Sequence, residues 1–209
     1  MNDRFLYLSL CFFLIWLSAC KRDATLPPNT FVDDRDGQRY TYLEVDGVVW
    51  MAQNMNYNVS GSQYNNDNPF SEYGRLYTLE QAKAACPTGW HLPTEAEWKT
   101  FEFKLGMAPT ELNALGYRGH NVGSSLKSAD GWTQGNGDNA FRCNVYPAGY
   151  YDPNDGNFYD LGRTAKLWTA SDSGSTTAWF RGLSDSFSGV NRYWTSKNDH
   201  LSCRCVQDE

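Results

Sequence analysis

The sequence predicts a single α+β domain, because helix signals come early in the chain and short strand signals follow them. Two segments carry capping boxes, in which Thr78 is followed by Gln81 and Thr94 by Glu97. After Gly106 the chain is rich in Gly, Asn, Asp and Ser, interrupted by short aromatic runs. Two early helices followed by short antiparallel strands and long loops are typical of an α+β fold.

The N-terminal segment reads as an export signal rather than part of the domain. Arg4 precedes an apolar run over residues 5–17, and the sequence LSAC then ends at Cys20. A membrane-spanning helix needs about 20 apolar residues, more than this segment offers before Lys21. A short apolar core that ends in small residues is typical of a secretory signal, so we assign residues 1–20 to one.

The LSAC ending resembles the lipobox of bacterial lipoproteins, in which the cysteine is lipidated and becomes the first residue of the mature chain. This resemblance implies that Cys20 anchors the protein in a membrane, which we expect to be the outer membrane. Ordinary secretion without a lipid is the alternative. Residues 21–30 are polar and contain Pro27 and Pro28, so we interpret them as a tether.

The folded domain is expected over residues 31–209, which is long enough to bury a hydrophobic core. The formal net charge of the chain is −6, and no run of Lys or Arg is present. Nucleic-acid-binding proteins carry basic patches, so nucleic acid is not an expected partner.

The remaining cysteines agree with export. An even number of cysteines in an oxidising compartment predicts two disulfides, and four cysteines allow three connectivities. Zinc is the rival interpretation of the CRC sequence, but a single intervening residue is shorter than the usual spacing of zinc ligands. The four cysteines of the mature domain are Cys86, Cys143, Cys203 and Cys205.

Local patterns predict the individual elements. The alternation over residues 38–54 around Asp46 and Gly47 predicts a β-hairpin. Helices are expected from Thr78 and from Thr94, the second with an apolar face at three-to-four spacing, and a third short helix is expected from Thr110. Further strands are predicted over residues 140–146, 157–161, 166–171, 176–184, 190–196 and 201–207.

Long motifs carry a resemblance to a known family. They read DGQRYTYLEVDGVVWMAQNMNY, YGRLYTLEQAKAACPTGWHLPTEAEWKTFE, PAGYY, LWTAS, AWFRGL and SCRCVQD. In this order they resemble the Fibrobacter succinogenes major paralogous domain family, which occurs largely in exported bacterial lipoproteins and whose biochemical role is not established. The resemblance covers residues 31–208.

The sequences HLPTEAEW and RCV are more remotely similar to formylglycine-generating enzymes, whose domain has a C-type-lectin-like architecture. In that fold a cysteine near the early helices bonds to one in the last strand. The resemblance therefore implies a C-type-lectin-like fold with a Cys86–Cys205 bridge, which leaves Cys143 and Cys203 for a second bridge.

Catalytic chemistry is not expected. Formylglycine-generating enzymes hold copper on a cysteine pair upstream of the last strand, whereas Cys203 and Cys205 lie within that strand. His91 has no histidine partner at metal-binding spacing, and we interpret it as structural despite the nearby Glu95 and Glu97. An oxidase of this type is therefore a remote alternative, and no catalytic residue is assigned.

A calcium site is the one cofactor that the sequence suggests. C-type lectins hold calcium on carboxylates and amides, but their EPN, QPD and WND signatures are absent. The nearest candidate is DPNDG, where Asp152, Asn154 and Asp155 carry oxygen ligands. A plain turn between two strands is the interpretation that we favour.

Aromatic residues make up 15% of the chain, and we expect two roles for them. An apolar body with a polar edge suits wet recognition surfaces as well as sheet packing. Trp50, Trp90, Trp98 and Trp168 fall in the family-like stretches and are expected in the core. The expected exposed partners for a ligand are Trp132, Tyr150, Tyr151, Tyr159 and Tyr193.

Together these observations predict a lipid-anchored protein of the bacterial cell envelope that is a non-catalytic glycan- or protein-binding module. The alternative is a structural or assembly subunit of a surface complex. A spare strand or an exposed apolar sheet edge would favour that alternative.

Overall fold

The computed structural model describes residues 29–66 and 71–209. The predicted signal, the lipidation site Cys20 and all but the last two residues of the predicted tether lie outside these ranges. Within the described residues no helix is long and apolar enough to cross a membrane. The helical elements are η1 (Ser71–Tyr73), α1 (Leu79–Ala85), α2 (Glu95–Lys104) and α3 (Val122–Leu126).

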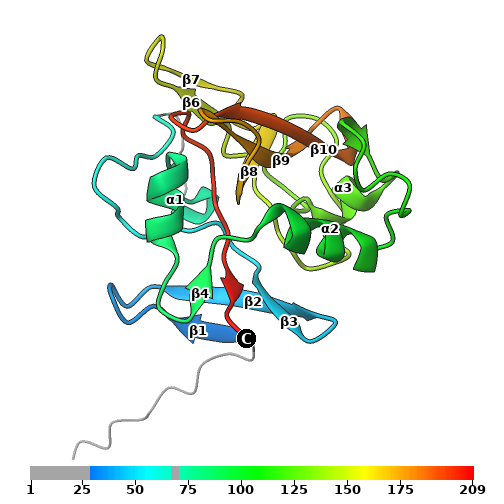
Figure 1. Ribbon diagram of the computed structural model, residues 1–209, viewed down its shortest axis with the longest axis horizontal. Coiled ribbons are helices and arrows are strands. Elements are labelled where there is room, and N and C mark those ends of the chain that lie inside the picture. The colour runs from blue at the N-terminus through cyan, green and yellow to red at the C-terminus, as the bar shows by residue number, and fades with distance from the viewer. Residues whose placement is uncertain (1–28, 67–70) are drawn as a thin grey trace, which may run out of the picture.

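Antiparallel strands form two main sheets and a separate hairpin, which confirms the predicted α+β class. The five-stranded sheet has the order β1-β2-β3-β11-β4, and the four-stranded sheet has the order β5-β10-β9-β8. Figure 1 shows the first sheet at the bottom, the second at the top and the β6–β7 hairpin beyond it, with α1 and α2 at an intermediate level.

The strand bounds follow. In the five-stranded sheet they are β1 (Thr30–Val32), β2 (Arg39–Val45), β3 (Val48–Met51), β4 (Trp90–His91) and β11 (Val206–Gln207). In the four-stranded sheet and the hairpin they are β5 (Gly116–Arg118), β6 (Tyr150–Asp152), β7 (Asn157–Tyr159), β8 (Thr164–Asp172), β9 (Thr177–Ser184) and β10 (Phe187–Ser196).

The β2–β3 hairpin forms as predicted from its two-residue turn. Asp46 has φ 54° and Gly47 has φ 81°. Positive φ at both central residues is the requirement of a type I′ turn, which matches the natural twist of the two strands. The turn therefore sets the register in which Val45 lies opposite Val48.

Both predicted capping boxes are present. The hydroxyl of Thr78 accepts a hydrogen bond from Gln81 N, and the hydroxyl of Thr94 accepts one from Glu97 N, each with the reciprocal side-chain bond. These bonds satisfy amides that the first turn of a helix leaves free, so they fix where α1 and α2 begin. After α2, Gly106 has φ 101°, which ends the helix in a conformation that glycine adopts at little cost.

Other local predictions were wrong. The residues after Thr110 form turns rather than a helix, and α3 begins instead at Val122. Residues 140–146 form no strand and contribute only an isolated bridge between Val145 and Lys127. In both regions long-range packing overrides weak local preference.

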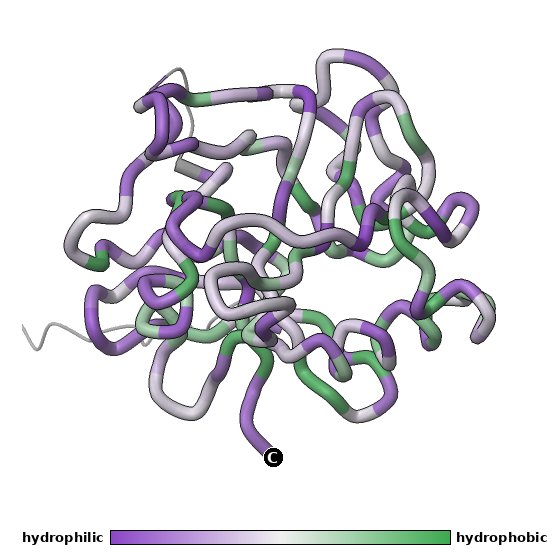
Figure 2. Tube along the Cα trace, turned by 45° about the horizontal axis from the view of Figure 1, so that its top comes forward, coloured by the Kyte–Doolittle hydropathy of each residue, from purple (hydrophilic) through white to green (hydrophobic). Residues whose placement is uncertain are grey.

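The C-terminal segment joins the two sheets. Ser202 forms a bridge with Leu167 of β8, and Val206 then pairs with Trp50 of β3 and with His91 of β4. In Figure 1 this segment runs from the upper sheet to the lower one through the middle of the molecule. Beyond β11 the chain is hydrophilic, as Figure 2 shows at the C-terminal end.

A disulfide fixes this segment to the end of α1. Cys86 and Cys205 are bonded, 119 residues apart in sequence, as the family resemblance implies. Closing a loop of this length restricts the unfolded chain by roughly 5 kcal/mol in the chain-entropy account. Structural disulfides persist in oxidising compartments, so the bond indicates an extracytoplasmic protein.

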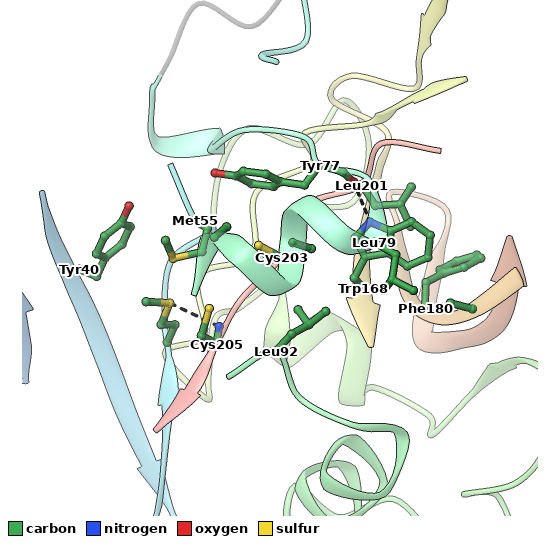
Figure 3. Close-up of a cluster of buried hydrophobic side chains, with 14 residues drawn as sticks. Tyr40, Met55, Tyr77, Leu79, Leu92, Trp168, Phe180, Leu201, Cys203 and Cys205 are labelled. Carbon is green, nitrogen blue, oxygen red and sulfur yellow. Dashed lines mark hydrogen bonds between the residues drawn. The ribbon is translucent and has the colours of Figure 1, made fainter. Parts of the chain in front are cut away.

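The core has two large clusters. Figure 3 shows the first, in which Tyr77, Trp168 and Leu201 pack between α1 and the four-stranded sheet, and Trp168 Nε1 donates to the Tyr77 carbonyl at 2.7 Å. The second is built on Trp50 and Trp98, whose ring centroids lie 5.2 Å apart. Of the four tryptophans expected in the core, Trp50, Trp98 and Trp168 are buried, and Trp90 is half-buried against Phe31.

The expected second bridge is absent, because Cys143 and Cys203 are both free and buried. They belong to different hydrophobic clusters. Alternate residues of an extended segment point in opposite directions, and Arg204 is the residue that faces Cys143, since its guanidinium donates to the Cys143 carbonyl. Cys203 therefore points away from Cys143.

We predict that the two free thiols are detectable by chemical labelling. Denatured but unreduced protein lacking residues 1–20 should incorporate two iodoacetamide groups by mass spectrometry, at Cys143 and Cys203. The same sample after reduction should incorporate four, and native protein should label slowly because both thiols are buried. No labelling before reduction would contradict this pairing.

Candidate recognition surface

Exposed aromatic side chains gather on the four-stranded sheet. We call four of them the aromatic ledge, because they come from adjacent strands β5 and β10 and from the bend that opens β10. Single exposed apolar residues are ordinary, whereas a group of them on neighbouring strands is a candidate interaction surface. The ledge consists of Tyr117, 38% exposed, Phe187, 53%, Tyr193, 43%, and Trp194, 36%.

Strand register places the first half of the ledge. Tyr117 lies opposite Asn191, and Tyr193 is two residues further along β10, so Tyr117 and Tyr193 share one face of the sheet. The β10–β9 register shifts between Phe187 and Asn191. The ring of Phe187 stacks on Tyr117, with centroids 4.1 Å apart and an interplanar angle of 17°.

The second half of the ledge is a three-ring cluster at the other end of β10. Tyr193 and Trp194 stack with centroids 4.2 Å apart at 9°. Trp179 of β9 is the cross-strand partner of Trp194 and meets it edge-on at 5.5 Å. The guanidinium of Arg192 lies 3.9 Å from the centroid of Trp179 and thus supports the cluster from behind.

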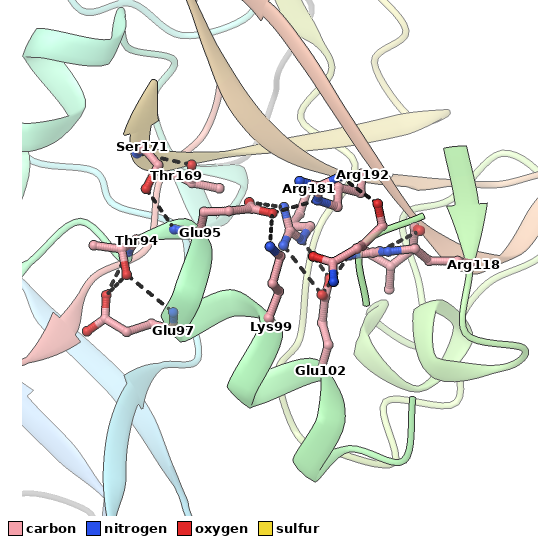
Figure 4. A network of polar contacts seen from close by, with 12 residues as sticks. Thr94, Glu95, Glu97, Lys99, Glu102, Arg118, Thr169, Ser171, Arg181 and Arg192 are labelled. Atoms are coloured by element: carbon pink, nitrogen blue, oxygen red, sulfur yellow. Dashed lines mark hydrogen bonds and ion pairs between the residues drawn. The ribbon is translucent and has the colours of Figure 1, made fainter. Parts of the chain in front are cut away.

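A buried ionic network anchors this cluster to α2 (Figure 4). Glu95 accepts hydrogen bonds from Arg192 at 2.5 Å and from Arg181 at 2.7 Å. Glu102, fully buried, accepts from Arg181 at 2.6 Å and from Arg118 at 2.7 Å. Buried charges are tolerated only when they are paired and hydrogen-bonded, so this network fixes the orientation of β9 and β10 against α2.

The network also favours the ionised form of Glu95. Burial alone raises the pKa of Glu95, but the hydrogen bonds from Arg181 and Arg192 outweigh it and hold the pKa below its ordinary value. The charges pair with one another, so the network supports the surface above it.

The β6–β7 hairpin carries three of the predicted ligand residues, Tyr150, Tyr151 and Tyr159. Tyr150 and Tyr159 stack with centroids 5.3 Å apart, and Lys166 Nζ lies 3.2 Å from the centroid of Tyr150. Burial lowers the pKa of Lys166. Tyr159 is exposed, so this pair forms a second, smaller aromatic site.

Two predicted ligand residues are placed differently. Trp132 is only 6% exposed, and its Nε1 donates to Ser128 Oγ at 3.0 Å, so the expectation of an exposed stacking partner was wrong. Tyr151 is half-buried between Phe158 and His200. The sequence analysis did not predict that Tyr117, Phe187 and Trp194 are exposed. Alternation along a strand shows which side chains share a face of the sheet, but it does not show which face the rest of the chain covers.

The predicted calcium residues form the β6–β7 turn. Asp152 Oδ1 accepts hydrogen bonds from Asn154 N and Nδ2, both at 2.8 Å. Asp155 accepts from Asn157 N at 3.0 Å and from the hydroxyl of Tyr159. The described residues contain no group of three or more His, Cys, Asp or Glu side chains arranged to hold a metal. The carboxylates thus act as turn acceptors here.

A groove of about 440 Å³ lies between the β2–β3 hairpin, α2 and the C-terminal segment. Its apolar lining includes Trp50, Phe101 and Val206, and its charged lining includes Lys104 and His91. The volume falls in the range of small-molecule sites.

His91 at the edge of this groove is held on both sides. Its Nδ1 lies 2.6 Å from Asp208 Oδ1, and its Nε2 lies 2.7 Å from Glu97 Oε1. Both ring nitrogens are therefore engaged by carboxylates. The histidine thus joins the C-terminal segment to the start of α2, and we call this arrangement the His91 clasp.

Comparison with known proteins gives the family. Residues 43–207 match the Fibrobacter succinogenes major domain. The chain belongs to this family. The match includes both halves of the aromatic ledge, the ionic network and the Cys86–Cys205 bridge. No curated protein and no solved structure matches the chain.

We predict that the His91 clasp makes stability depend on pH. Burial lowers the pKa of His91, but Asp208 and Glu97 outweigh it and raise the pKa above its ordinary value. The stabilisation is therefore complete below about pH 6.5, the unfolded value, and is lost as pH rises through the higher folded value. The side chain is 40% exposed, so the effect should be below about 1 kcal/mol.

Urea unfolding between pH 6 and pH 9 measures this effect. The wild-type protein should lose more stability over this interval than His91→Gln, which cannot carry the charge. Identical pH dependence in the two proteins would show that the clasp is electrostatically neutral.

Proposed function

We propose that this member of the family is a lipid-anchored protein of the bacterial cell envelope that binds a glycan or a protein non-covalently through the aromatic ledge. The observation that carries the proposal is the exposed Tyr193–Trp194 stack, buttressed by Trp179 and Arg192. Rigid aromatic rings with polar edges give contact area at low cost in conformational entropy.

The position of the ledge supports display away from a membrane. The proposed anchor is Cys20, and the nine residues from Lys21 to Asn29 reach at most about 32 Å. They lead into β1, which lies at the opposite end of the molecule from β10 and the β6–β7 hairpin (Figure 1). A domain held by this end would present both aromatic sites outward.

A C-type-lectin-like architecture belongs to the same proposal. β2 and β3 near the start of the domain pair in one sheet with β11 at its end, and a disulfide joins the end of α1 to the last strand. The long irregular stretch between α3 and β6 gives the kind of loop region that such folds use for binding.

An oxidase function has little support. Copper binding would require accessible thiolates, but burial raises the pKa of Cys143 to about 12 and also raises the pKa of Cys203. The two thiols also lie in different clusters. An assembly subunit remains the second candidate, and it is favoured by the partly unpaired edge of β10.

We predict that ligand binding depends on the ledge. Protein lacking residues 1–20, tested on a glycan array and in a pull-down from bacterial envelope extract, should bind at least one partner. Tyr193→Ala and Trp194→Ala should each weaken that binding by roughly tenfold or more, as expected for an exposed aromatic anchor.

The matched control is Phe103→Ala, which removes a ring that is 46% exposed on α2 and lies outside the ledge. It should bind as the wild type does. Unchanged binding by Tyr193→Ala and Trp194→Ala, or silence in both assays, would refute the proposal.

A further inference from the structure

The second half of the ledge lies on a strand edge that is open on one side. β10 pairs with β9 from Phe187 to Ser196, but β5 covers only Val190 to Arg192. Among the described residues, the part of β10 that follows Arg192 therefore has a neighbouring strand on the β9 side and none on the other. Such an edge is a template for one more strand.

The register shows which backbone groups face outward. Lys197 N donates to Thr176 O, and the same ladder places Ser196 opposite Thr177. Hydrogen-bonded and non-bonded pairs alternate along antiparallel strands, so Tyr193 and Thr195 direct their backbone groups toward β9. Trp194 and Ser196 direct theirs toward the open side.

These outward groups are largely unsatisfied. The N–H and C=O of Trp194 have no hydrogen-bond partner among the described residues. At Ser196 the carbonyl already accepts from Asp199 N at 3.1 Å, which closes the edge at this end. The free set is thus the N–H and C=O of Trp194 followed by the N–H of Ser196.

Apolar side chains flank the free groups. Tyr193 and Trp194, whose rings stack on each other, are both exposed, and Leu115, just before β5, is 51% exposed. An added strand would lie along β10 just beyond Gly116, the residue at which β5 begins, and would cover these three side chains.

We propose that an extended polypeptide segment of another protein adds to β10 at Trp194 as a fifth strand of this sheet, with its apolar side chains on Tyr193, Trp194 and Leu115. The inference rests on the proposed function and names its ligand class. Backbone amides and carbonyls at strand spacing match the free groups of β10, whereas the hydroxyls of a glycan do not repeat at that spacing.

The test uses the mature chain and a defined probe. Random 12-residue peptides displayed on phage are selected against the immobilised protein, and the selected peptides are then synthesised. Amide exchange is followed by NMR with and without each peptide. Exchange of the Trp194 amide should slow at least tenfold on binding, whereas the Tyr193 and Thr195 amides, already bonded to β9, should change little.

A second measurement separates strand addition from side-chain contact alone. N-methylation of successive peptide residues removes one backbone donor at a time. Strand addition predicts that binding is lost at every second position in the segment that lies against Trp194 and is retained at the positions between them. Uniform tolerance to N-methylation would overturn the inference.

Three further outcomes count against it. The first is that no peptide is selected, and the second is that a peptide binds but leaves the Trp194 amide unprotected from exchange. The third is that the Trp194 amide of the protein alone becomes more protected as the protein concentration rises. That result would show that a second copy of the chain occupies the edge. If Tyr193→Ala still abolishes capture of a glycan while the Trp194 amide stays unprotected, the proposed function stands and strand addition fails.

Discussion

The C-terminal segment is the constraint on which the rest of the structure depends. Within a few residues it pairs with β8 of one sheet through Ser202 and with β3 and β4 of the other through Val206. The Cys86–Cys205 bond fixes it covalently to the end of α1 between these two contacts. This segment pairs with strands of both sheets, and those strands are far apart in sequence. The two sheets therefore cannot separate unless the C-terminal segment breaks its hydrogen bonds to one of them.

The second long-range device is ionic. Glu95 and Glu102 of α2 hold Arg118, Arg181 and Arg192 of the four-stranded sheet, all of them largely buried. An ionic network in this place is costly to desolvate and gains stability only when every member is paired, so it defines orientation more than it adds stability. Arg192 extends that orientation to Trp179, and the ledge therefore rests on a rigid base.

The proposed function would give the two ends of the molecule different tasks. The five-stranded sheet holds the entry of the chain in β1, the exit in β11 and the His91 clasp. The four-stranded sheet and the β6–β7 hairpin carry the exposed aromatic rings. In the proposed function this arrangement would separate the lipid anchor from the recognition surface.

The sequence by itself determined the features that neighbouring residues decide. The Asp46–Gly47 turn, both capping boxes and the strands β8, β9 and β10 follow from local conformational preference and alternation. The Cys86–Cys205 pairing came from family resemblance, because four cysteines alone leave the connectivity open. Of the predicted recognition residues, Tyr159 and Tyr193 proved exposed.

Tertiary structure alone decided the rest. Trp132 is buried and Trp194 exposed, although both lie among polar residues in sequence, because burial depends on which distant segment covers a ring. Contacts between distant segments also decide that Cys143 and Cys203 lie in separate clusters. Such contacts likewise bring glutamates and arginines that are far apart in sequence, such as Glu102 and Arg181, into one network. The edge of β10 beyond Arg192 is open because β5 begins only at Gly116, and no local pattern records where a neighbouring strand will begin.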